Sequence, residues 1–167
     1  DESGNEVVLL PEIIFSNKQN INWNDVEDYL GKYVGELIEI AETRDIIYIG
    51  NKFPDEYGGS SYTRKTKGAR AKAKANAAQG IREMVEIATD KVYRENHKEK
   101  HSEDAHNGWF YYVTRFAIPL YNNEKKTGEY NVYSACLVVN HAANGKMYLY
   151  DVVDIKKEAS NPLKTIK

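Results

Sequence analysis

The pattern of apolar and polar residues predicts helices in the first half of the chain and strands in the second half. Asn24, with Glu27 three residues later, has capping-box spacing and predicts the start of a helix. A second short helix is predicted by four apolar residues at helical spacing, namely Val34, Leu37, Ile38 and Ala41. The apolar run at residues 44–50 then predicts a short buried strand.

The middle of the chain reads as a turn-rich segment followed by helices. In residues 51–63, Pro54 and the pair Gly58 and Gly59 are expected to break any regular element. The stretch from Thr63 to Gly80 predicts a basic helix that ends near Gly80. A second amphipathic helix is predicted directly after it, at residues 81–88.

Aromatic and β-branched runs dominate the last part of the chain. Residues 109–121, 129–140 and 146–156 predict three strands, and residues 90–96 could form a fourth. Asn144 and Gly145 predict a tight hairpin. The fold class is therefore predicted as α+β, with N-terminal helices packed on a C-terminal antiparallel sheet of about four strands. We expect residues 1–22 to form an N-terminal extension and residues 23–167 to form a single α+β domain.

Alternation along the predicted strands assigns their faces. In the first long strand the core face is expected to carry Phe110, Tyr112, Thr114, Phe116, Ile118 and Leu120. Arg115 then lies on the other face, where tyrosines from the last strand would join it and where a concave surface would suit a polyanion. The alternative is that Arg115 pairs with an acidic residue on a neighbouring strand. In the last strand one face is expected to hold Met147, Leu149, Val153 and Ile155, and the other Tyr148, Tyr150 and Asp154.

Composition and charge limit the classes of protein to consider. Charged residues make up 29% of the chain, and the net charge of −2 predicts no overall attraction to nucleic acid. The single cysteine, Cys136, excludes a disulfide framework and is expected to be buried and inert. No apolar run approaches the roughly 18 residues of a membrane span. Because the sequence opens without Met, we expect it to be part of a longer polypeptide whose native location is unknown.

The basic stretch is the strongest local charge feature. It contains six cations and no acidic residue: Arg64, Lys65, Lys67, Arg70, Lys72 and Lys74. Lys67, Arg70 and Lys74 fall at helical spacing, so they are predicted to share one face, and no acid on the helix is spaced to relieve their repulsion. We therefore predict that this surface binds the phosphates of RNA. The alternative is a solvated helix with high intrinsic propensity.

Histidines offer the candidate acid and base groups. His97, His101 and His106 lie among carboxylates in one polar segment, but nothing in the pattern holds them rigidly, so no metal site is predicted. His101 is a candidate general acid or base, because histidine titrates near neutral pH. Lys100 or Arg115 would stabilise phosphate charge beside it. A second proton-transfer group would be His141, which could equally be an ordinary turn residue.

Four segments together resemble a known family: FPDEYGGSSYT, AKAKANAAQGIREMVEIAT, KHSEDAHNGWFYYVTRFAIPL and GKMYLYDVVDIKKEASNPL. They are similar to a module near the C-termini of large polymorphic-toxin and phage-associated proteins, in the large polyvalent protein-associated class. That module is grouped with the barnase, EndoU, colicin E5/D and RelE-like (BECR) ribonucleases. The resemblance covers residues from about Val34 to Leu163, and it implies a BECR-like fold with helices followed by an antiparallel sheet.

The resemblance also implies functional positions. Lys100, His101, Arg115 and Tyr150 match positions that are expected to be functional. The hairpin at His141 departs from the pattern, because Asn140 and Ala142 stand where the resemblance leads us to expect an arginine and an acid.

These observations predict a metal-independent ribonuclease toxin that needs no cofactor. It would cleave RNA, tRNA being one candidate substrate, by transesterification to a 2′,3′-cyclic phosphate. His101 would act with Lys100 and Arg115, and His141 or Tyr150 would be the second proton-transfer group. The expected partners are RNA and a cognate immunity protein, and the expected place of action is the cytoplasm of the host or of a target cell. The alternative is a non-catalytic accessory module of a phage or mobile-element protein that binds nucleic acid or a protein.

Overall fold

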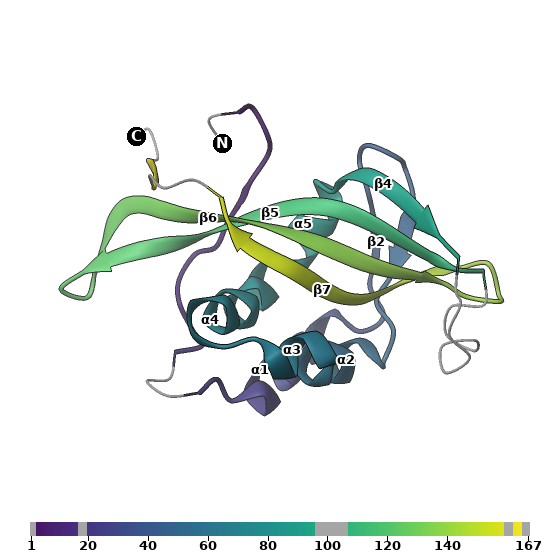
Figure 1. Ribbon diagram of the computed structural model, residues 1–167, viewed down its shortest axis with the longest axis horizontal. Coiled ribbons are helices and arrows are strands. Elements are labelled where there is room, and N and C mark those ends of the chain that lie inside the picture. The colour runs from purple at the N-terminus through teal and green to yellow at the C-terminus, as the bar shows by residue number, and fades with distance from the viewer. Residues whose placement is uncertain (1–2, 17–19, 96–106, 159–161, 165–167) are drawn as a thin grey trace.

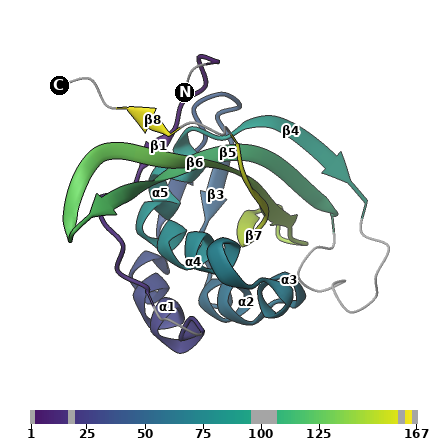
Figure 2. The same cartoon turned by 60° about the vertical axis from the view of Figure 1, so that its left-hand side comes forward.

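Long twisted strands form a curved sheet, and the helices lie on its concave side (Figures 1 and 2). The computed structural model describes residues 3–16, 20–95, 107–158 and 162–164. A sheet with helices packed on one side makes the domain α+β, as predicted. Arg115 belongs to the face that is turned away from the helices, so the expectation that its face is concave is wrong.

The sheet is larger than predicted, and it is mixed. Its strands are β1 Val8–Leu9, β2 Leu37–Glu39, β3 Ile46–Tyr48, β4 Thr89–Arg94, β5 Trp109–Asn122, β6 Lys125–His141, β7 Met147–Lys157 and β8 Leu163–Lys164. In the described part of the chain these eight strands run in the order β1-β5-β6-β7-β3-β2, with β4 paired to β5 and β8 to β6. The pairs β1–β5 and β3–β7 are parallel. The prediction of about four antiparallel strands therefore holds only for the central part, β4 to β7.

Five short α-helices in the described residues pack under this sheet. They are α1 Trp23–Leu30, α2 Phe53–Gly59, α3 Ser61–Lys65, α4 Gly68–Ala77 and α5 Ile81–Glu86, with 3-10 turns at Gly31–Tyr33 and Ala78–Gly80. The N-cap of α1 is Asn22 and not Asn24, because the Asn22 side chain accepts from the Asn24 backbone N–H at 3.1 Å. The predicted basic helix is divided into α3 and α4 by an extended Thr66 and Lys67.

Two elements differ from their predictions for identifiable reasons. The segment predicted as a second helix contains β2, in which buried Ile38 lies between exposed Leu37 and exposed Glu39. Strand alternation therefore prevailed over an equally good helical spacing of apolar residues. The segment predicted as turns contains α2, where Pro54 lies in the first turn and loses no helical hydrogen bond. Gly58 lies so close to α1 that an added Cβ would be 2.6 Å from Glu27 Cγ, so this glycine permits close packing rather than a turn.

The long strands follow the predicted alternation on β5 but not on β7. Tyr112, Thr114 and Phe116 of β5 are all buried on the helix side, as expected. On β7 the register against β6 shifts at two places, and Asp151 and Val152 are both buried in succession. These β-bulges change which residues face inward. The prediction that Val153 lies on the core face is therefore wrong.

A buried ion pair joins α4 to β7. Lys74 Nζ lies 2.6 Å from Asp151 Oδ1, and the two side chains are 0% and 3% exposed. The same ammonium donates to Thr63 Oγ1 at 2.6 Å, and it lies 4.7 Å from the centre of the Tyr57 ring. Burial lowers the pKa of Lys74 and raises the pKa of Asp151, because desolvation outweighs the attraction between the two charges. The pair therefore fixes the position of α4 against β7, and the burial of its two charges costs solvation free energy.

The segment before residue 23 contributes to the core. β1 pairs with β5 in parallel at Phe116 and Ala117, and Leu10 directly after β1 is fully buried. The Asn76 side chain of α4 accepts from the backbone N–H groups of Ile14 and Phe15 at 2.9 and 3.1 Å. These contacts join the N-terminal segment to both layers of the domain.

The adjacent residues Leu9 and Leu10 give a matched test of this packing. Leu10→Ala is expected to lower the free energy of unfolding by about 2–5 kcal/mol, because it leaves a cavity in the core. Leu9, which is 43% exposed, should change it by no more than about 0.5 kcal/mol on the same substitution. Urea denaturation of both variants measures the difference. Equal effects would mean that the N-terminal segment is not packed as described.

The ion pair makes a second prediction. Lys74→Met should destabilise the domain by about 3–5 kcal/mol, because it leaves the Asp151 carboxylate buried without its partner. The double variant Lys74→Met/Asp151→Leu should recover most of that loss, because it removes both desolvated charges. Lys72→Met, two residues away and partly exposed, is the control and should be nearly neutral. A single variant no less stable than the control would contradict the burial of this pair.

Candidate active site

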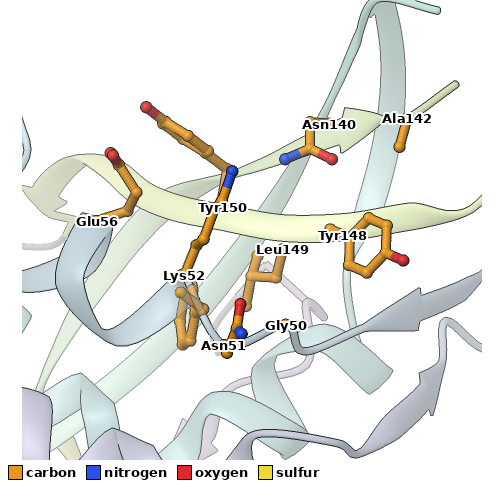
Figure 3. A pocket seen from close by; sticks show the side chains of 10 residues that line it. Gly50, Asn51, Lys52, Glu56, Asn140, Ala142, Tyr148, Leu149 and Tyr150 are labelled. Atoms are coloured by element: carbon orange, nitrogen blue, oxygen red, sulfur yellow. The ribbon is translucent and has the colours of Figure 1, made fainter. Parts of the chain in front are cut away.

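A pocket of about 290 Å³ opens between β7 and the segment that leads from β3 into α2. Its polar and aromatic lining residues are Asn51, Lys52, Phe53, Glu56, Asn140, Tyr148 and Tyr150. β3 pairs with β7 only at Ile47–Met147 and Tyr48–Tyr148. The chain then turns at Gly50 and enters α2 at Phe53, so no strand of the described residues lies beside this edge of β7 from Leu149 onward. The pocket occupies this gap (Figure 3).

Asn140 of β6 provides an unusual group in this pocket. It lies opposite Trp109 and Tyr148 in the strand register, so these three side chains share one face of the sheet. Asn140 is only 7% exposed, and its buried Oδ1 has no hydrogen-bond partner among the described residues. Buried polar side-chain atoms in native proteins nearly always have a partner, so an unpaired one indicates a place that a ligand could occupy.

Lys52, Glu56 and Tyr150 supply the chemical groups near Asn140. Figure 3 shows Lys52 extending toward the strand that carries Tyr150. The Glu56 carboxylate and the Tyr150 hydroxyl lie on one side of the Lys52 ammonium, and the Asn140 amide lies on the other side. The Tyr150 ring packs edge-on against Trp109 with a centroid distance of 5.0 Å. The pocket therefore combines an ammonium, a carboxylate, a phenol and an amide on packed secondary structure.

The structure does not bring the described members of the predicted catalytic set together. Lys100 and His101 lie outside the described residues, as do His97 and His106. Arg115 Nε lies 2.7 Å from Glu158 Oε1. Arg115 therefore pairs with an acid, but Glu158 follows β7 and does not lie on a strand beside β5, so this is not the cross-strand pair that the alternative expected. Arg115 is also six residues along β5 from Trp109, or about 20 Å at the usual rise of a strand. It therefore cannot contact the same phosphate as Tyr150.

His141 also points away from Tyr150. Its ring lies 5.5 Å from the ring of Phe110, which packs against the main core on the helix side of the sheet. Tyr150 packs on Trp109, on the opposite face. Of the predicted proton-transfer residues that the structure describes, only Tyr150 lines the pocket.

The basic surface is smaller than predicted. Arg64, Lys65, Lys67 and Arg70 are exposed, Lys72 is partly exposed, and Lys74 is buried. The prediction that Lys67, Arg70 and Lys74 share a solvent-facing surface is wrong for Lys74, because Asp151 of β7 covers the end of α4. Lys67 precedes the helix in an extended conformation, so helical spacing does not apply to it. The exposed cations gather around the α3–α4 connection.

The sequence predictions missed Lys52, Glu56 and Asn140 as site residues. Glu56 lies in a segment that was expected to form turns, so its place on a helix facing β7 could not be anticipated. Asn140 was noted only for its position beside His141. Asn140 is a polar residue at the end of a predicted strand, and such a position gives no indication that the side chain is buried.

Cys136 is only partly buried, so the expectation of a buried cysteine is wrong. Its partial burial still raises the pKa of the thiol to about 11, so the thiol is protonated at neutral pH. Within the described ranges, no group of three or more histidine, cysteine or acidic residues is arranged to hold a metal ion. No helix in this part of the chain has the length and apolar character needed to cross a membrane.

Comparisons with protein-family models, curated proteins and solved structures give no significant match.

The exposed cations give a test of RNA binding. Replacing Lys67 and Arg70 by Glu should weaken the predicted RNA binding and should reduce the slope of log K against log salt concentration by about one per lost phosphate contact. The control replaces Lys125 and Lys126, which are exposed at the start of β6, by Glu. Fluorescence anisotropy with a labelled RNA over a range of salt concentrations measures both. An equal loss in the two variants would argue against a specific surface at the α3–α4 connection.

Proposed function

We propose that this domain is a metal-independent ribonuclease whose active site includes the pocket. The observation that carries the proposal is that Tyr150 lies there with Lys52, Glu56 and the unpaired Asn140. A carboxylate, a phenol and an ammonium are the groups that such a reaction needs to move protons and to stabilise phosphate charge. Support also comes from the order of α2–α5 before the long antiparallel strands β5–β7, which is the order that the sequence resemblance implies, although the whole sheet is larger and mixed.

The proposed reaction is transesterification of RNA. Glu56 would take the proton from the ribose 2′-OH as that oxygen forms a bond to phosphorus. Lys52 would stabilise the negative charge on the phosphate. Tyr150, or the predicted His101, would protonate the 5′-oxygen as its bond to phosphorus breaks. The products are a 2′,3′-cyclic phosphate and a free 5′-hydroxyl. The exposed cations Arg64, Lys65, Lys67 and Arg70 would hold the RNA backbone outside the pocket.

The wider biological role follows from the same proposal. A ribonuclease toxin would act on RNA, tRNA being one candidate, in the cytoplasm of its host or of a target cell. A self-toxic nuclease needs a cognate immunity protein. An acidic inhibitor that covers the exposed cations would have the complementary charge.

A second candidate function is a non-catalytic module that binds nucleic acid or protein. The specific observation in its favour is the separation of Arg115, His141 and Tyr150 in the structure. In that case the pocket and the exposed cations would bind RNA without cutting it.

Cleavage assays with matched variants test the proposal. Purified protein should cut total tRNA or a generic RNA in the presence of EDTA. Glu56→Gln and Tyr150→Phe should each reduce the rate about 100-fold or more, which is typical for the loss of a general acid or base. Asp55→Asn, on the exposed side of the same helix, and Tyr121→Phe, which is 40% exposed on β5, should leave the rate unchanged.

The outcomes separate the two candidate functions. RNA that stays intact but shifts on a gel would favour the binding module. Cleavage that is lost in His101→Ala but kept in Glu56→Gln and Tyr150→Phe would place the active site outside the pocket. Thermal unfolding of each variant shows whether the fold is intact.

A further inference from the structure

We infer that the Asn140 end of the pocket binds one nucleobase, and that it selects a base with an exocyclic amine beside an unprotonated ring nitrogen. Adenine and cytosine have this pair on their Watson–Crick edge, and guanine, hypoxanthine and uracil do not. The inference rests on the proposed function, because it names the base that the RNA site would receive.

Without a ligand, the amide oxygen of Asn140 lacks a hydrogen bond in the described part of the chain. Its Oδ1 is buried and unpaired among the described residues, although the amide lies in a strand whose neighbours Val138 and Val139 are apolar. An apolar residue would pack there without leaving a polar atom unpaired, so asparagine costs stability at this position. A hydrogen-bond donor supplied by a ligand would remove that cost.

The donor and acceptor of the Asn140 amide determine which base edge it can bind. An asparagine side chain offers one acceptor and one donor side by side, and this pair matches an amine next to a ring nitrogen. Oδ1 would accept from the amine and Nδ2 would donate to the ring nitrogen. In hypoxanthine and uracil an oxo group replaces the amine and the adjacent ring nitrogen carries a hydrogen. With the amide in the orientation of the structure, two acceptors and two donors would then face each other. The site should therefore reject such a base.

The shape and charge of the rest of the pocket suit a nucleotide. A volume of about 290 Å³ suits a single nucleotide rather than a folded nucleic acid. The Tyr148 hydroxyl is engaged by Asn144 Nδ2 at 3.2 Å and points away from Tyr150, so Tyr148 offers the pocket its ring more than its hydroxyl. An aromatic ring suits the flat face of a base. Lys52 lies between Asn140 and Glu56, where a phosphate attached to the bound nucleoside would meet a cation (Figure 3).

Binding of nucleoside monophosphates tests the inference directly. Isothermal titration calorimetry with AMP and IMP, and with CMP and UMP, compares two pairs in which an amine is replaced by an oxo group. The amine-bearing member of at least one pair should bind about tenfold more tightly or better, as expected for one satisfied hydrogen bond at a buried group. The pair that shows the difference identifies adenine or cytosine. Equal affinities within both pairs, or no binding by any of the four, would overturn the inference.

Matched asparagine variants complete the test. Asn140→Val should abolish the discrimination while the melting temperature stays the same or rises, because an unpaired polar atom is removed. Asn131→Val, on the same strand and partly buried, should keep the discrimination. An Asn140→Val protein that still discriminates would overturn the inference. If Asn140→Val fails to fold, the comparison of AMP with IMP on the natural sequence still decides.

The cleavage assay separates failure of this inference from failure of the proposed function. RNA that is cut in EDTA by a protein with no preference within either nucleotide pair would leave the ribonuclease standing and the base selection refuted. Nucleotide discrimination without any cleavage would refute the ribonuclease and keep base recognition for a binding module.

Discussion

The buried ion pair between Lys74 and Asp151 is the constraint on which the arrangement of α4, α2, α3 and β7 depends. An ammonium and a carboxylate that are withdrawn from water cannot remain apart at an acceptable free energy. α4 and β7 can therefore pack only where these two groups meet. Thr63 at the start of the basic stretch accepts a second hydrogen bond from the ammonium, which fixes α3 as well. The buried alanines of α4 allow the helix to approach the sheet closely enough for the contact to form.

The same pair determines the geometry of the pocket, because Asp151 and Tyr150 are consecutive on β7. Consecutive residues of a strand point to opposite faces, so Asp151 faces the helices while Tyr150 packs on Trp109 on the other side of the sheet. A slip of β7 by one residue would exchange these faces, moving the phenol out of the pocket and leaving the Lys74 ammonium without its carboxylate. The desolvation cost of the pair thus protects the register of a strand that carries a candidate functional group. Structure and proposed function are linked through neighbouring residues of one strand.

Much of the secondary structure could be predicted from the sequence, and the site could not. The long strands and the basic helical region were foreseeable because aromatic alternation and alanine-rich composition are strong local signals. β2 and α2 were missed because short segments satisfy helical and strand spacing equally well, and because Pro54 and Gly58 act in packing rather than in turns. The pairing of Lys74 joins residues far apart in the chain, and no local pattern shows which cation of a basic run will be buried. The pocket likewise depends on where β3 leaves β7, which only the assembled sheet reveals.

Two buried asparagines show how structural and functional polar groups can be told apart in this fold. Asn76 is fully buried, and its amide is satisfied by the backbone of Ile14, Phe15 and Lys72. Its burial is explained by folding alone, because it joins the N-terminal segment to α4. Asn140 is nearly as buried, yet its Oδ1 has no partner in the described part of the chain, and the residue lines a pocket with a lysine and a tyrosine. No contact of the described residues satisfies Oδ1, so folding alone does not account for the burial of this amide. The proposed ligand would account for it by donating a hydrogen bond to Oδ1.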